Sequence, residues 1–563
     1  MIAGSGAVRG VAVTRSGGRV LVDQLELHGV EIAFCVPGES YLPVLDALHD
    51  ARIRLISCRH EAAAANMAEA YGKLTGRPGI CLVTRGPGST HASIGVHIAW
   101  QDSTPMILLA GQVRRAFVGR DAFQELDYPH VFGGLAKWAV QAEDAGRLPE
   151  LVARAFAVAV SGRPGPVVLA LPEDVLAEET DAPDAAPIHV PHPQPSEDDL
   201  RRLRQLLERS ERPLAIVGEG GWTADAAQGV LAFCEANDVP VAASFRCQDY
   251  VDNRSRVYAG HLTLGMDARL ARRVQESDFV LAVGGRLGDI TTRDYTLLEV
   301  PRPQQTLVHV HPDPDELGRV YEPDLPIVSG VTELAAGLQE LEPVDSSRWR
   351  EWTASARADY LANLRHRPLP GCLDLGEVMA FLRRRLPEDA VLACGAGNFT
   401  VWAHRFYEFA RFGTQLAPRA GAMGYGLPAA LAAKALHPER LVVCLAGDGD
   451  FMMAASELAT AAQYELPVVV LVVNNGMYGT IRMHQERHYP GRVVGTDLLN
   501  PDFADFARSF GCHGETVERT SEVEAAFERA VRSGLPSVID LRVDPEAIHP
   551  RQTITEIRAA SRA

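Results

Sequence analysis

The chain has 563 residues, of which 47% are hydrophobic and 23% are charged. These proportions are those of a globular protein, and they exclude a disordered, collagen-like or membrane-embedded chain. Asp and Glu (72) outnumber Lys and Arg (55), giving a formal net charge of −17, which disfavours a protein that binds nucleic acid through its phosphates. We therefore expect a small-molecule partner and no nucleic acid.

The nine cysteines are scattered and form no CxxC pair, which argues against both a disulfide framework and a zinc site. The first 20 residues lack the apolar core of a signal peptide. The longest apolar run, residues 466–473, is far shorter than the roughly 18 residues that span a bilayer. The sequence therefore predicts a cytoplasmic protein with no membrane segment.

Short β-branched runs alternate with Ala-, Leu-, Glu- and Arg-rich stretches over most of the chain. Continuous apolar strands between helices are typical of parallel sheets covered on both faces, so we expect an α/β fold made of doubly wound sheets. The runs that we read as buried strands are residues 80–84, 106–110, 166–171, 214–217, 279–283, 441–445 and 468–473.

Two stretches have the composition of linkers. Residues 178–195 are dense in Pro, Ala, Asp and Glu, and residues 342–370 mix charged residues with Pro. They predict three α/β domains of similar size, at 1–180, 195–342 and 370–548, followed by a polar tail after Pro550.

The strongest chemical signal lies in the third domain, where two predicted strands each end in a polar turn. Gly447-Asp448-Gly449 follows the first strand, and Asn474-Asn475 follows the second after 24 intervening residues. Glycines let the backbone approach a phosphate closely, and a carboxylate with an amide oxygen suits Mg²⁺. Each motif alone would also fit a tight turn, but together, at the carboxyl ends of strands, they favour a cofactor site.

This pair of motifs resembles the thiamine-diphosphate (ThDP) binding motif. The resemblance covers about residues 18–545 and is to the group of acetolactate synthase, pyruvate oxidase and benzoylformate decarboxylase. It implies pyrimidine-binding, central and diphosphate-binding domains in that order. It also implies that ThDP and Mg²⁺ bind, with the metal held by the Asp448 carboxylate, the Asn475 side chain and the Met477 carbonyl oxygen.

The resemblance implies a catalytic role for Glu61, which follows a strand-like run and opens a helix. In the family this glutamate hydrogen-bonds N1′ of the cofactor's pyrimidine and so promotes loss of the thiazolium C2 proton. A carboxylate in an apolar pocket is suited to sharing a proton because desolvation raises its pKa. Without the resemblance, Glu61 would read as an acid favoured by the helix dipole.

Other segments match the family residue by residue. Met423, in the stretch 421–428, resembles the apolar support over which the cofactor bends. Gly86 and Gln124 lie in segments, 86–88 and 122–125, that resemble acetolactate synthase, where the second faces the substrate. The remaining residues that the resemblance places at the cofactor are Gly395, Gly397, Asn398, Gly421, Gly447, Gly449, Asp450 and Tyr478.

Some positions depart from acetolactate synthases. Thr480 and His484 stand where those enzymes place a methionine and a tryptophan over the second 2-oxo acid, and residues 474–479 are closer to benzoylformate decarboxylase. Asp450 replaces a commoner serine. Glu39 is either an acid in the active site or a solvated loop residue. His91, His261 and His484 are candidates for acid–base work because histidine titrates near neutrality.

Three functions remain open at this stage. The first is an acetolactate-synthase-like decarboxylation and carboligation of a 2-oxo acid with a carbonyl acceptor. The second is a decarboxylase or lyase of a larger, aromatic or 2-hydroxyacyl compound, and the third is a catalytically silent homologue. The family resemblance also implies a homo-oligomer, a dimer or a tetramer, with active sites between subunits. It makes FAD possible, but residues 260–267 are shortened relative to the flavin-contacting stretch, which argues against it.

Overall fold

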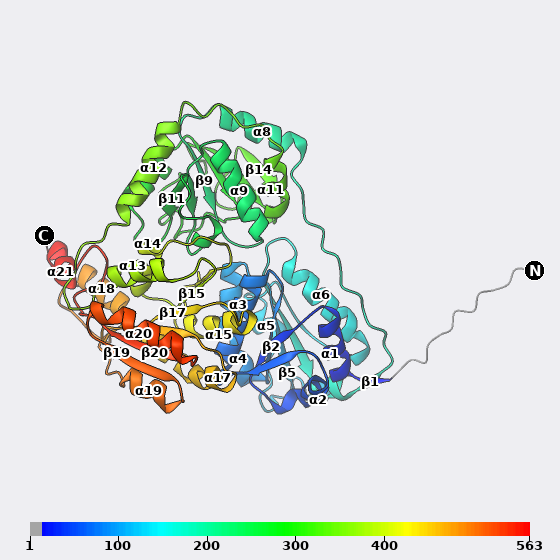
Figure 1. Cartoon of the computed structure of the whole chain (residues 1–563). Helices are drawn as coiled ribbons and strands as arrows, with labels where there is room; N and C mark the ends of the chain where they lie inside the picture. The colour runs from blue at the N-terminus through cyan, green and yellow to red at the C-terminus, as the bar shows by residue number, and fades with distance from the viewer. Residues whose placement is uncertain (1–13, 563) are drawn as a thin grey trace, which may run out of the picture.

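The computed structural model describes residues 14–562. It contains three six-stranded sheets in which every pair of neighbouring strands runs parallel. Figure 1 shows the central domain above, with the first and third domains side by side beneath it. This architecture confirms the predicted α/β fold with three doubly wound sheets.

The first sheet has the strand order β3-β2-β4-β5-β7-β6. The chain enters it after β1 (Arg15–Ser16), which pairs antiparallel with β8 (Glu179–Thr180). The strands are β2 (Ile32–Cys35), β3 (Arg54–Ser57), β4 (Gly79–Val83), β5 (Met106–Gln112), β6 (Trp138–Gln141) and β7 (Pro166–Pro172). The longer helices are α1 (Gly17–Leu27), α2 (Leu42–His49), α3 (Glu61–Thr75), α4 (Gly86–Asp102) and α6 (Leu148–Val160).

The central sheet has the order β11-β10-β9-β12-β13-β14. Its strands are β9 (Pro213–Val217), β10 (Val241–Ala243), β11 (Tyr258–His261), β12 (Phe279–Val283), β13 (Thr306–His311) and β14 (Leu325–Val328). Its helices are α8 (Glu197–Glu208), α9 (Ala224–Ala236), α10 (Ala268–Glu276) and α11 (Val331–Gln339), and α12 (Arg350–Asn363) leads on to the third domain.

The third sheet has the order β16-β15-β17-β18-β20-β19. Its strands are β15 (Val391–Cys394), β16 (Gln415–Leu416), β17 (Val442–Gly447), β18 (Val469–Asn474), β19 (His513–Val517) and β20 (Ser537–Arg542). Its helices are α13 (Leu375–Arg385), α14 (Phe399–Phe406), α15 (Gly426–Leu436), α16 (Asp448–Met452), α17 (Leu458–Gln463), α18 (Gly479–His488), α19 (Phe503–Ser509), α20 (Thr520–Ser533) and α21 (Ile554–Arg562).

Helices α3 and α15 pack against each other and join the first and third domains (Figure 1). Both are rich in alanine, so their backbones approach closely, and their buried side chains belong to one hydrophobic core shared by the two domains. Burying Leu427 and Leu431, the two buried leucines of α15, contributes roughly 1.5–3 kcal/mol each relative to exposure. The Tyr425 hydroxyl donates a 2.6 Å hydrogen bond to Glu69 across the same junction.

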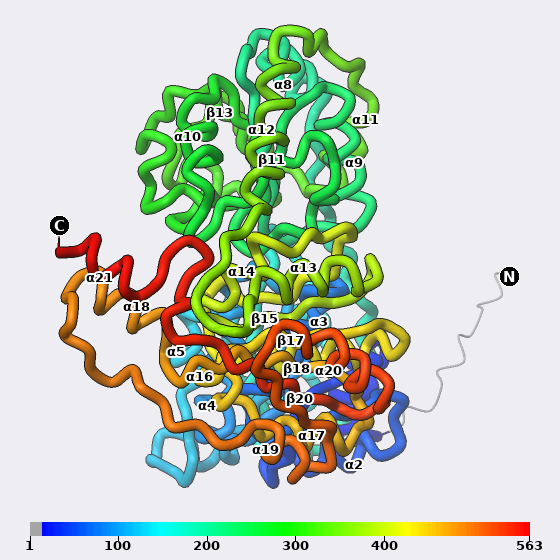
Figure 2. Tube along the Cα trace, turned by 60° about the vertical axis from the view of Figure 1, so that its left-hand side comes forward, coloured from blue at the N-terminus to red at the C-terminus, as the bar shows by residue number. Residues whose placement is uncertain are grey.

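The end of the chain differs from the polar tail that the sequence predicts after Pro550. Residues 554–562 form α21, which packs against α18, as Figure 2 shows at its left edge. The sequence gives no clear amphipathic pattern for this helix, because only two of its residues, Ile554 and Ile557, are buried. Arg558 pairs with the buried Glu486 of α18 at 2.7 Å.

Within residues 14–562, no helix is both long and apolar enough to cross a membrane. All nine cysteines are free thiols, and eight of them are buried, as expected for small hydrophobic side chains.

Candidate active site

The predicted diphosphate-binding residues gather at one edge of the third sheet. Strands β15, β17 and β18 are neighbours and run parallel, so their carboxyl ends meet at the same edge. The turns that follow them carry, in order, residues 395–398, 447–450 and 475–478. The apolar strands thus bring together three segments that are up to 83 residues apart in the sequence (Gly395 to Tyr478).

The Asp448 carboxylate is buried and held from two sides. One oxygen accepts the Gly449 N–H at 2.9 Å, and the other accepts the Asn500 amide at 2.8 Å. Burial raises the pKa of Asp448, and the Asn500 hydrogen bond counteracts that rise. Asn500 also donates to Asn474 at 3.2 Å, so it orients both polar turns. The sequence reasoning missed Asn500, which lies far from either motif.

Asp450 links two of the turns and explains the departure at that position. Its carboxylate accepts N–H groups from Gly424 at 2.8 Å and from Ala396 at 3.3 Å. A Cβ atom at Gly395 would lie 2.1 Å from both carboxylate oxygens, so only glycine fits there. Burial raises the pKa of Asp450 to about 7, against the lowering effect of these N–H groups.

The donor set at this edge fits a hard divalent cation and a diphosphate. Asp448 and Asn475 offer oxygens, and the chain continues directly to the Met477 carbonyl; such ligands suit Mg²⁺. A Cβ at Gly449 would lie 2.5 Å from the Tyr478 ring, and one at Gly447 would lie 2.9 Å from the Phe399 ring. Only glycine therefore fits at these two positions, where an aromatic ring packs against the backbone.

A cavity of about 590 Å³ opens over this edge. Met423 borders it and is 40% exposed, and the central domain closes its far wall. The predicted residues that line it are Gly397, Asn398, Gly421, Met423, Gly447, Asp448, Gly449, Asp450, Asn475, Met477 and Tyr478. Side chains that the motif analysis did not assign to the site also line it, among them Phe245, Arg246, Leu264, Ile290, Trp402 and Arg419.

Thr480 and His484 lie in different places on α18. Thr480 lines the cavity, and its hydroxyl donates a 3.0 Å hydrogen bond to Asn398. His484 is exposed, is absent from the cavity lining, and has its ring 6.1 Å from that of His488. Partial burial and Arg487 lower the pKa of His484. Its role in proton transfer stays a prediction.

The predicted catalytic residues of the first domain gather at the carboxyl edge of their own sheet. Glu61 begins α3 after β3, and its carboxylate lies 2.9 Å from the Nδ1 atom of His91 on α4. The rings of His60 and His91 stack with centroids 4.7 Å apart. A Cβ at Gly88 would lie 3.4 Å from Glu61 Oε1, so the glycine leaves room beside this carboxylate.

Two further predicted residues lie near this edge. The Gly86 N–H donates a 3.0 Å hydrogen bond to the Gln124 carbonyl, and Gln124 has a left-handed backbone with φ of 65°. Glu39 has its carboxylate 3.0 Å from the buried Arg85 guanidinium, but its side chain is 70% exposed. Both alternatives for Glu39, an acid at the active site and a loop residue, therefore stay open.

Within one chain, the two edges do not share the cavity. No residue numbered below 245 lines it, so neither Glu61, Gln124 nor Glu39 reaches it. The sequence predicts that all these residues serve one site, and a single copy of the chain leaves that site in two halves.

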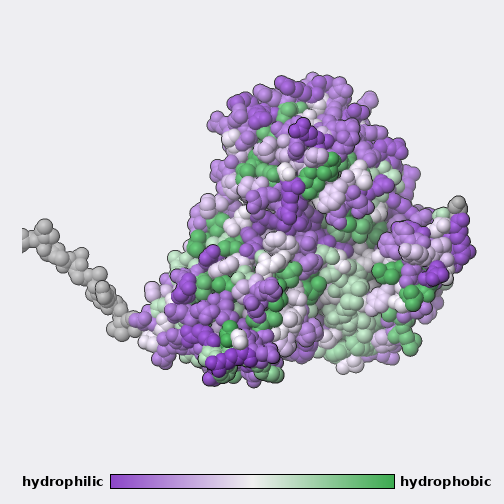
Figure 3. Space-filling model, turned by 180° about the vertical axis from the view of Figure 1, so that it is seen from behind, coloured by the Kyte–Doolittle hydropathy of each residue, from purple (hydrophilic) through white to green (hydrophobic). Residues whose placement is uncertain are grey.

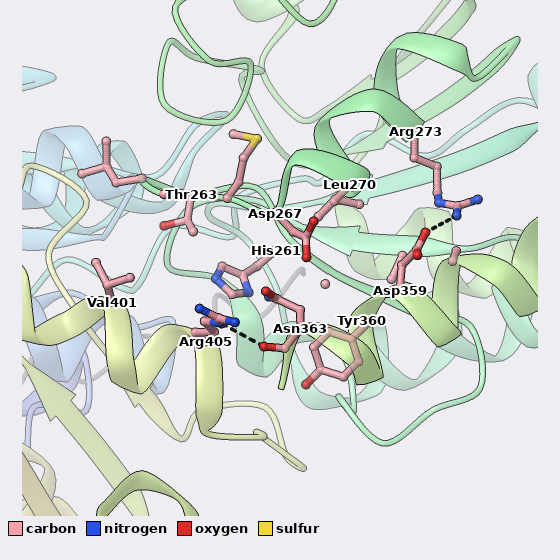
Figure 4. Close-up of a pocket in the computed structure, with 16 residues that line it drawn as sticks. His261, Thr263, Asp267, Leu270, Arg273, Asp359, Tyr360, Asn363, Val401 and Arg405 are labelled. Carbon is pink, nitrogen blue, oxygen red and sulfur yellow. Dashed lines mark hydrogen bonds and ion pairs between the residues drawn. The ribbon is translucent and has the colours of Figure 1, made fainter. Parts of the chain in front are cut away.

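His261 lines a second, much smaller pocket of about 20 Å³ between the central and third domains. Figure 4 shows His261 beside Arg405 and Asn363, with the Arg273–Asp359 ion pair farther along the wall. Burial lowers the pKa of His261 to about 4, so its imidazole is neutral at pH 7. The structure thus separates His261 from the diphosphate edge.

Comparison with known proteins agrees with this geometry. The thiamine pyrophosphate (that is, ThDP) enzyme models match the N-terminal TPP binding domain at residues 15–131, the central domain at 200–340 and the C-terminal TPP binding domain at 395–541.

Similar proteins cover nearly the whole chain. The chain is 33% identical to an acetolactate synthase large subunit of Parasynechococcus marenigrum, over 94% of this chain and 88% of the relative. It is 31% identical to the acetolactate synthase isozyme 2 large subunit of Escherichia coli, over 94% and 96%. It is 32% identical to the large subunit from Corynebacterium glutamicum, over 94% and 87%. The chain belongs to the thiamine pyrophosphate enzyme family and is a ThDP-dependent enzyme.

Proposed function

We propose that this enzyme decarboxylates a 2-oxo acid and joins the remaining acyl group to a carbonyl acceptor, with ThDP and Mg²⁺ as cofactors. The observation that carries the proposal is the convergence of Asp448, Asn475 and the glycine turns at one sheet edge beneath a cavity. The names of the acetolactate synthase relatives supply the reaction class.

In this proposal the residues of the third domain bind and orient the cofactor. Asp448, Asn475 and the Met477 carbonyl would hold Mg²⁺, and the turns at residues 395–398 and 447–450 would lie against the diphosphate. Met423, which lines the cavity, would support the rings of the bound cofactor. When bound, ThDP supplies an electron sink for the loss of CO₂ from the 2-oxo acid.

Glu61 and Gln124 act from the first domain. Glu61 would share a proton with the N1′ atom of a bound pyrimidine and so favour loss of the C2 proton. Gln124 donates a hydrogen bond to the substrate carbonyl. Tyr478 and Thr480 line the cavity that would take the acceptor.

We also propose that the active site forms between two copies of the chain, in a dimer or tetramer. The separation of the two sheet edges in one chain supports this arrangement. Large exposed apolar side chains occur in both ThDP-binding domains, including Leu42, Phe123, Met452, Met453 and Leu499. In Figure 3 a green area lies at the lower right of the view, while the lower left and most of the upper part are purple with scattered green.

The proposal gives no role to FAD. Glu219 follows β9 at the carboxyl edge of the central sheet, the edge at which a doubly wound domain takes a nucleotide. Glu219 is 2% exposed and lies 2.8 Å from the Arg286 guanidinium. A flavin nucleotide would need this ion pair to move.

NMR of the purified protein with ThDP, Mg²⁺ and pyruvate, with and without an aldehyde, tests the reaction. Acetolactate or another acyloin as product supports the proposal. Absence of pyruvate turnover while the C2 proton of bound ThDP still exchanges contradicts it.

One observation favours a second candidate, a decarboxylase or lyase of a larger substrate. Thr480 is small, and the cavity walls beside it carry the apolar side chains of Leu264, Ile290 and Trp402. Turnover of phenylglyoxylate or a 2-hydroxyacyl compound, with pyruvate inert, would support this alternative.

A further inference from the structure

Arg246 places a buried positive charge in the wall of the cavity. It follows β10 in the central domain, has a left-handed backbone with φ of 61°, and is 8% exposed. A non-glycine residue in this conformation is uncommon, so the surrounding structure must hold it there.

The other buried arginines of residues 14–562 all have a carboxylate partner. Four arginines fall in the buried class: Arg85, Arg163, Arg246 and Arg273. Arg85 pairs with Glu39, Arg163 with Glu316 at 3.1 Å, and Arg273 with Asp359 at 2.5 Å. Arg246 alone among these four has no carboxylate oxygen within 4.0 Å.

The contacts that Arg246 does make leave most of its donors free. One terminal nitrogen donates to the Pro418 carbonyl, and the guanidinium lies 4.9 Å from the centroid of the Phe245 ring. The Nε donor is buried and has no acceptor. A buried charge without a counter-ion is costly, and a carbonyl and a ring satisfy it only in part.

The two carboxylates whose charges influence Arg246, those of Asp102 and Asp450, already accept hydrogen bonds from other groups. Asp102 pairs with Lys73 and accepts the Arg419 N–H at 2.9 Å. Asp450 accepts the N–H groups of Gly424 and Ala396. Burial lowers the pKa of Arg246, and these two carboxylates offset that effect; arginine nevertheless stays charged at neutral pH.

We propose that Arg246 is an anion-binding residue of the active site and binds the carboxylate of an acceptor 2-oxo acid. The inference rests on the proposed function. A planar guanidinium matches a carboxylate through two parallel hydrogen bonds. Phe245 and Ile290 line the same wall and offer apolar contact to the rest of that molecule.

The acceptor's carboxylate fits this role better than the donor's. The donor loses its carboxylate as CO₂, and a strong ion pair to that group before the reaction would stabilise the ground state against decarboxylation. The acceptor keeps its carboxylate in the product. Arg246 would thus set the preference for an acidic acceptor over a neutral aldehyde.

Binding of two ligands of the same shape and different charge tests the proposal. Lactate and lactamide are measured by equilibrium dialysis against the full chain loaded with ThDP and Mg²⁺. We expect lactate to bind at least about tenfold more tightly, since hydrogen bonds to charged groups are worth about 10- to 100-fold in affinity. Arg246→Met removes the preference, and Arg246→Lys keeps part of it.

Arg357→Met is the matched control. Arg357 also bonds a carbonyl, that of Asn253 at 2.7 Å, and lies against an aromatic ring, that of Tyr360, but it lines neither pocket. This variant keeps the lactate preference. The thermal midpoint of each variant is measured in parallel. Where Arg246→Met fails to fold, Arg246→Lys is compared with the wild type instead, and equal wild-type affinity for lactate and lactamide overturns the proposal without any variant.

Three results overturn the proposal. The first is equal affinity of the wild type for lactate and lactamide. The second is a preference that survives in folded Arg246→Met. The third is loss of ThDP affinity in that variant with the lactate preference intact, which would assign Arg246 to the diphosphate. ThDP binding, measured in the same samples, separates these results from failure of the proposed function, which a wild type unable to bind ThDP would reveal.

Discussion

The Glu61 carboxylate lies 2.9 Å from the Nδ1 atom of His91. Glu61 begins α3, and His91 lies within α4. They meet because β3 and β4, which precede these helices, both flank β2 and end at the same edge of the first sheet. His91 is therefore placed to orient the carboxylate that we propose as the proton partner of the cofactor.

Replacing Glu61 should abolish catalysis without unfolding the protein. Glu61→Ala and Glu61→Gln remove the carboxylate that shares a proton with N1′, and we expect C2–H exchange of bound ThDP to slow by about 10²- to 10⁴-fold. Hydrogen–deuterium exchange followed by NMR measures this rate. His91→Asn retains the carboxylate and should slow exchange far less. Wild-type exchange in Glu61→Ala would remove the proposed role.

Two inactive variants should restore activity when they are co-expressed. If Glu61 of one copy and Asp448 of another serve one site, a mixed dimer of Glu61→Ala and Asp448→Ala contains one intact site. Random pairing then returns about a quarter of the wild-type activity. If each copy carried its own complete site, every site would hold one substitution and no activity would return. Sedimentation of an active monomer would contradict the arrangement as well.

Metal-dependent cofactor binding should depend on Asp448 and, more weakly, on Asn500. Asp448→Asn removes the only carboxylate of the proposed ligand set, and we expect Mg²⁺-supported ThDP affinity to fall at least about 100-fold. Asn500→Ala frees one Asp448 oxygen and should cost about tenfold, as outer partners of metal ligands do. Calorimetric titration with and without EDTA measures both. Asp505→Asn, an exposed change on α19, is the control and should bind ThDP as the wild type does. Wild-type ThDP affinity in Asp448→Asn would exclude the metal role of Asp448.

A methyl group at Gly395 should displace Asp450. The added Cβ would lie 2.1 Å from both carboxylate oxygens, so we expect Gly395→Ala to lower stability by about 1–3 kcal/mol and to weaken ThDP binding. Asp450→Ser shortens the opposing side chain, and the double variant should recover part of both losses. Gly134→Ala, where nothing lies within 4 Å, is the control in thermal unfolding. A double variant as poor as Gly395→Ala would contradict this reading of Asp450.

The buried Glu219 should make stability depend on pH. Burial raises the pKa of its carboxyl, but Arg419 and Arg286 outweigh that effect and bring the pKa to about 2. A depressed folded pKa adds stability that is complete above the unfolded value near 4.5 and is lost as the pH falls toward about 2.

The free energy of unfolding of Glu219→Gln should therefore be about 3 kcal/mol lower than that of the wild type at pH 7. This difference in stability should become smaller below pH 4.5. Thermal midpoints between pH 7 and 3.5 measure it. The exposed Glu524→Gln on α20 should follow the wild type throughout. A gap that stays constant to pH 3.5 would show that the ion pairs do not set the carboxyl's pKa.

Much of the fold and of the diphosphate edge could be predicted from local sequence. The strands at 441–445 and 468–473 are uninterrupted apolar runs, and the polar turns follow them directly, so parallel pairing alone brings Asp448 near Asn475. The helix that begins at Glu61 is equally local, because His60 caps it and alanines fill it.

The features that could not be predicted from the sequence depend on contacts between segments that are far apart in the chain. Asn500 reaches Asp448 across 52 residues, and no spacing rule connects them. Arg246 reads as an ordinary arginine until the cavity wall and its missing carboxylate are known. Helix α21 buries only two isoleucines, too few to distinguish it from a tail by periodicity. Thr480 and His484 lie one helical turn apart, and only the orientation of α18 decides which faces the cavity.

The apolar core shared by α3 and α15 limits how this chain can be divided. A fragment carrying the third domain alone would present Leu427, Ala430 and Leu431 to water, and the first domain alone would present the alanines of α3. The central domain has cores of its own. Truncation, fusion or circular permutation of the gene is therefore best made at the borders of the central domain. A fragment that lacked either the first or the third domain would contain only half of their shared core.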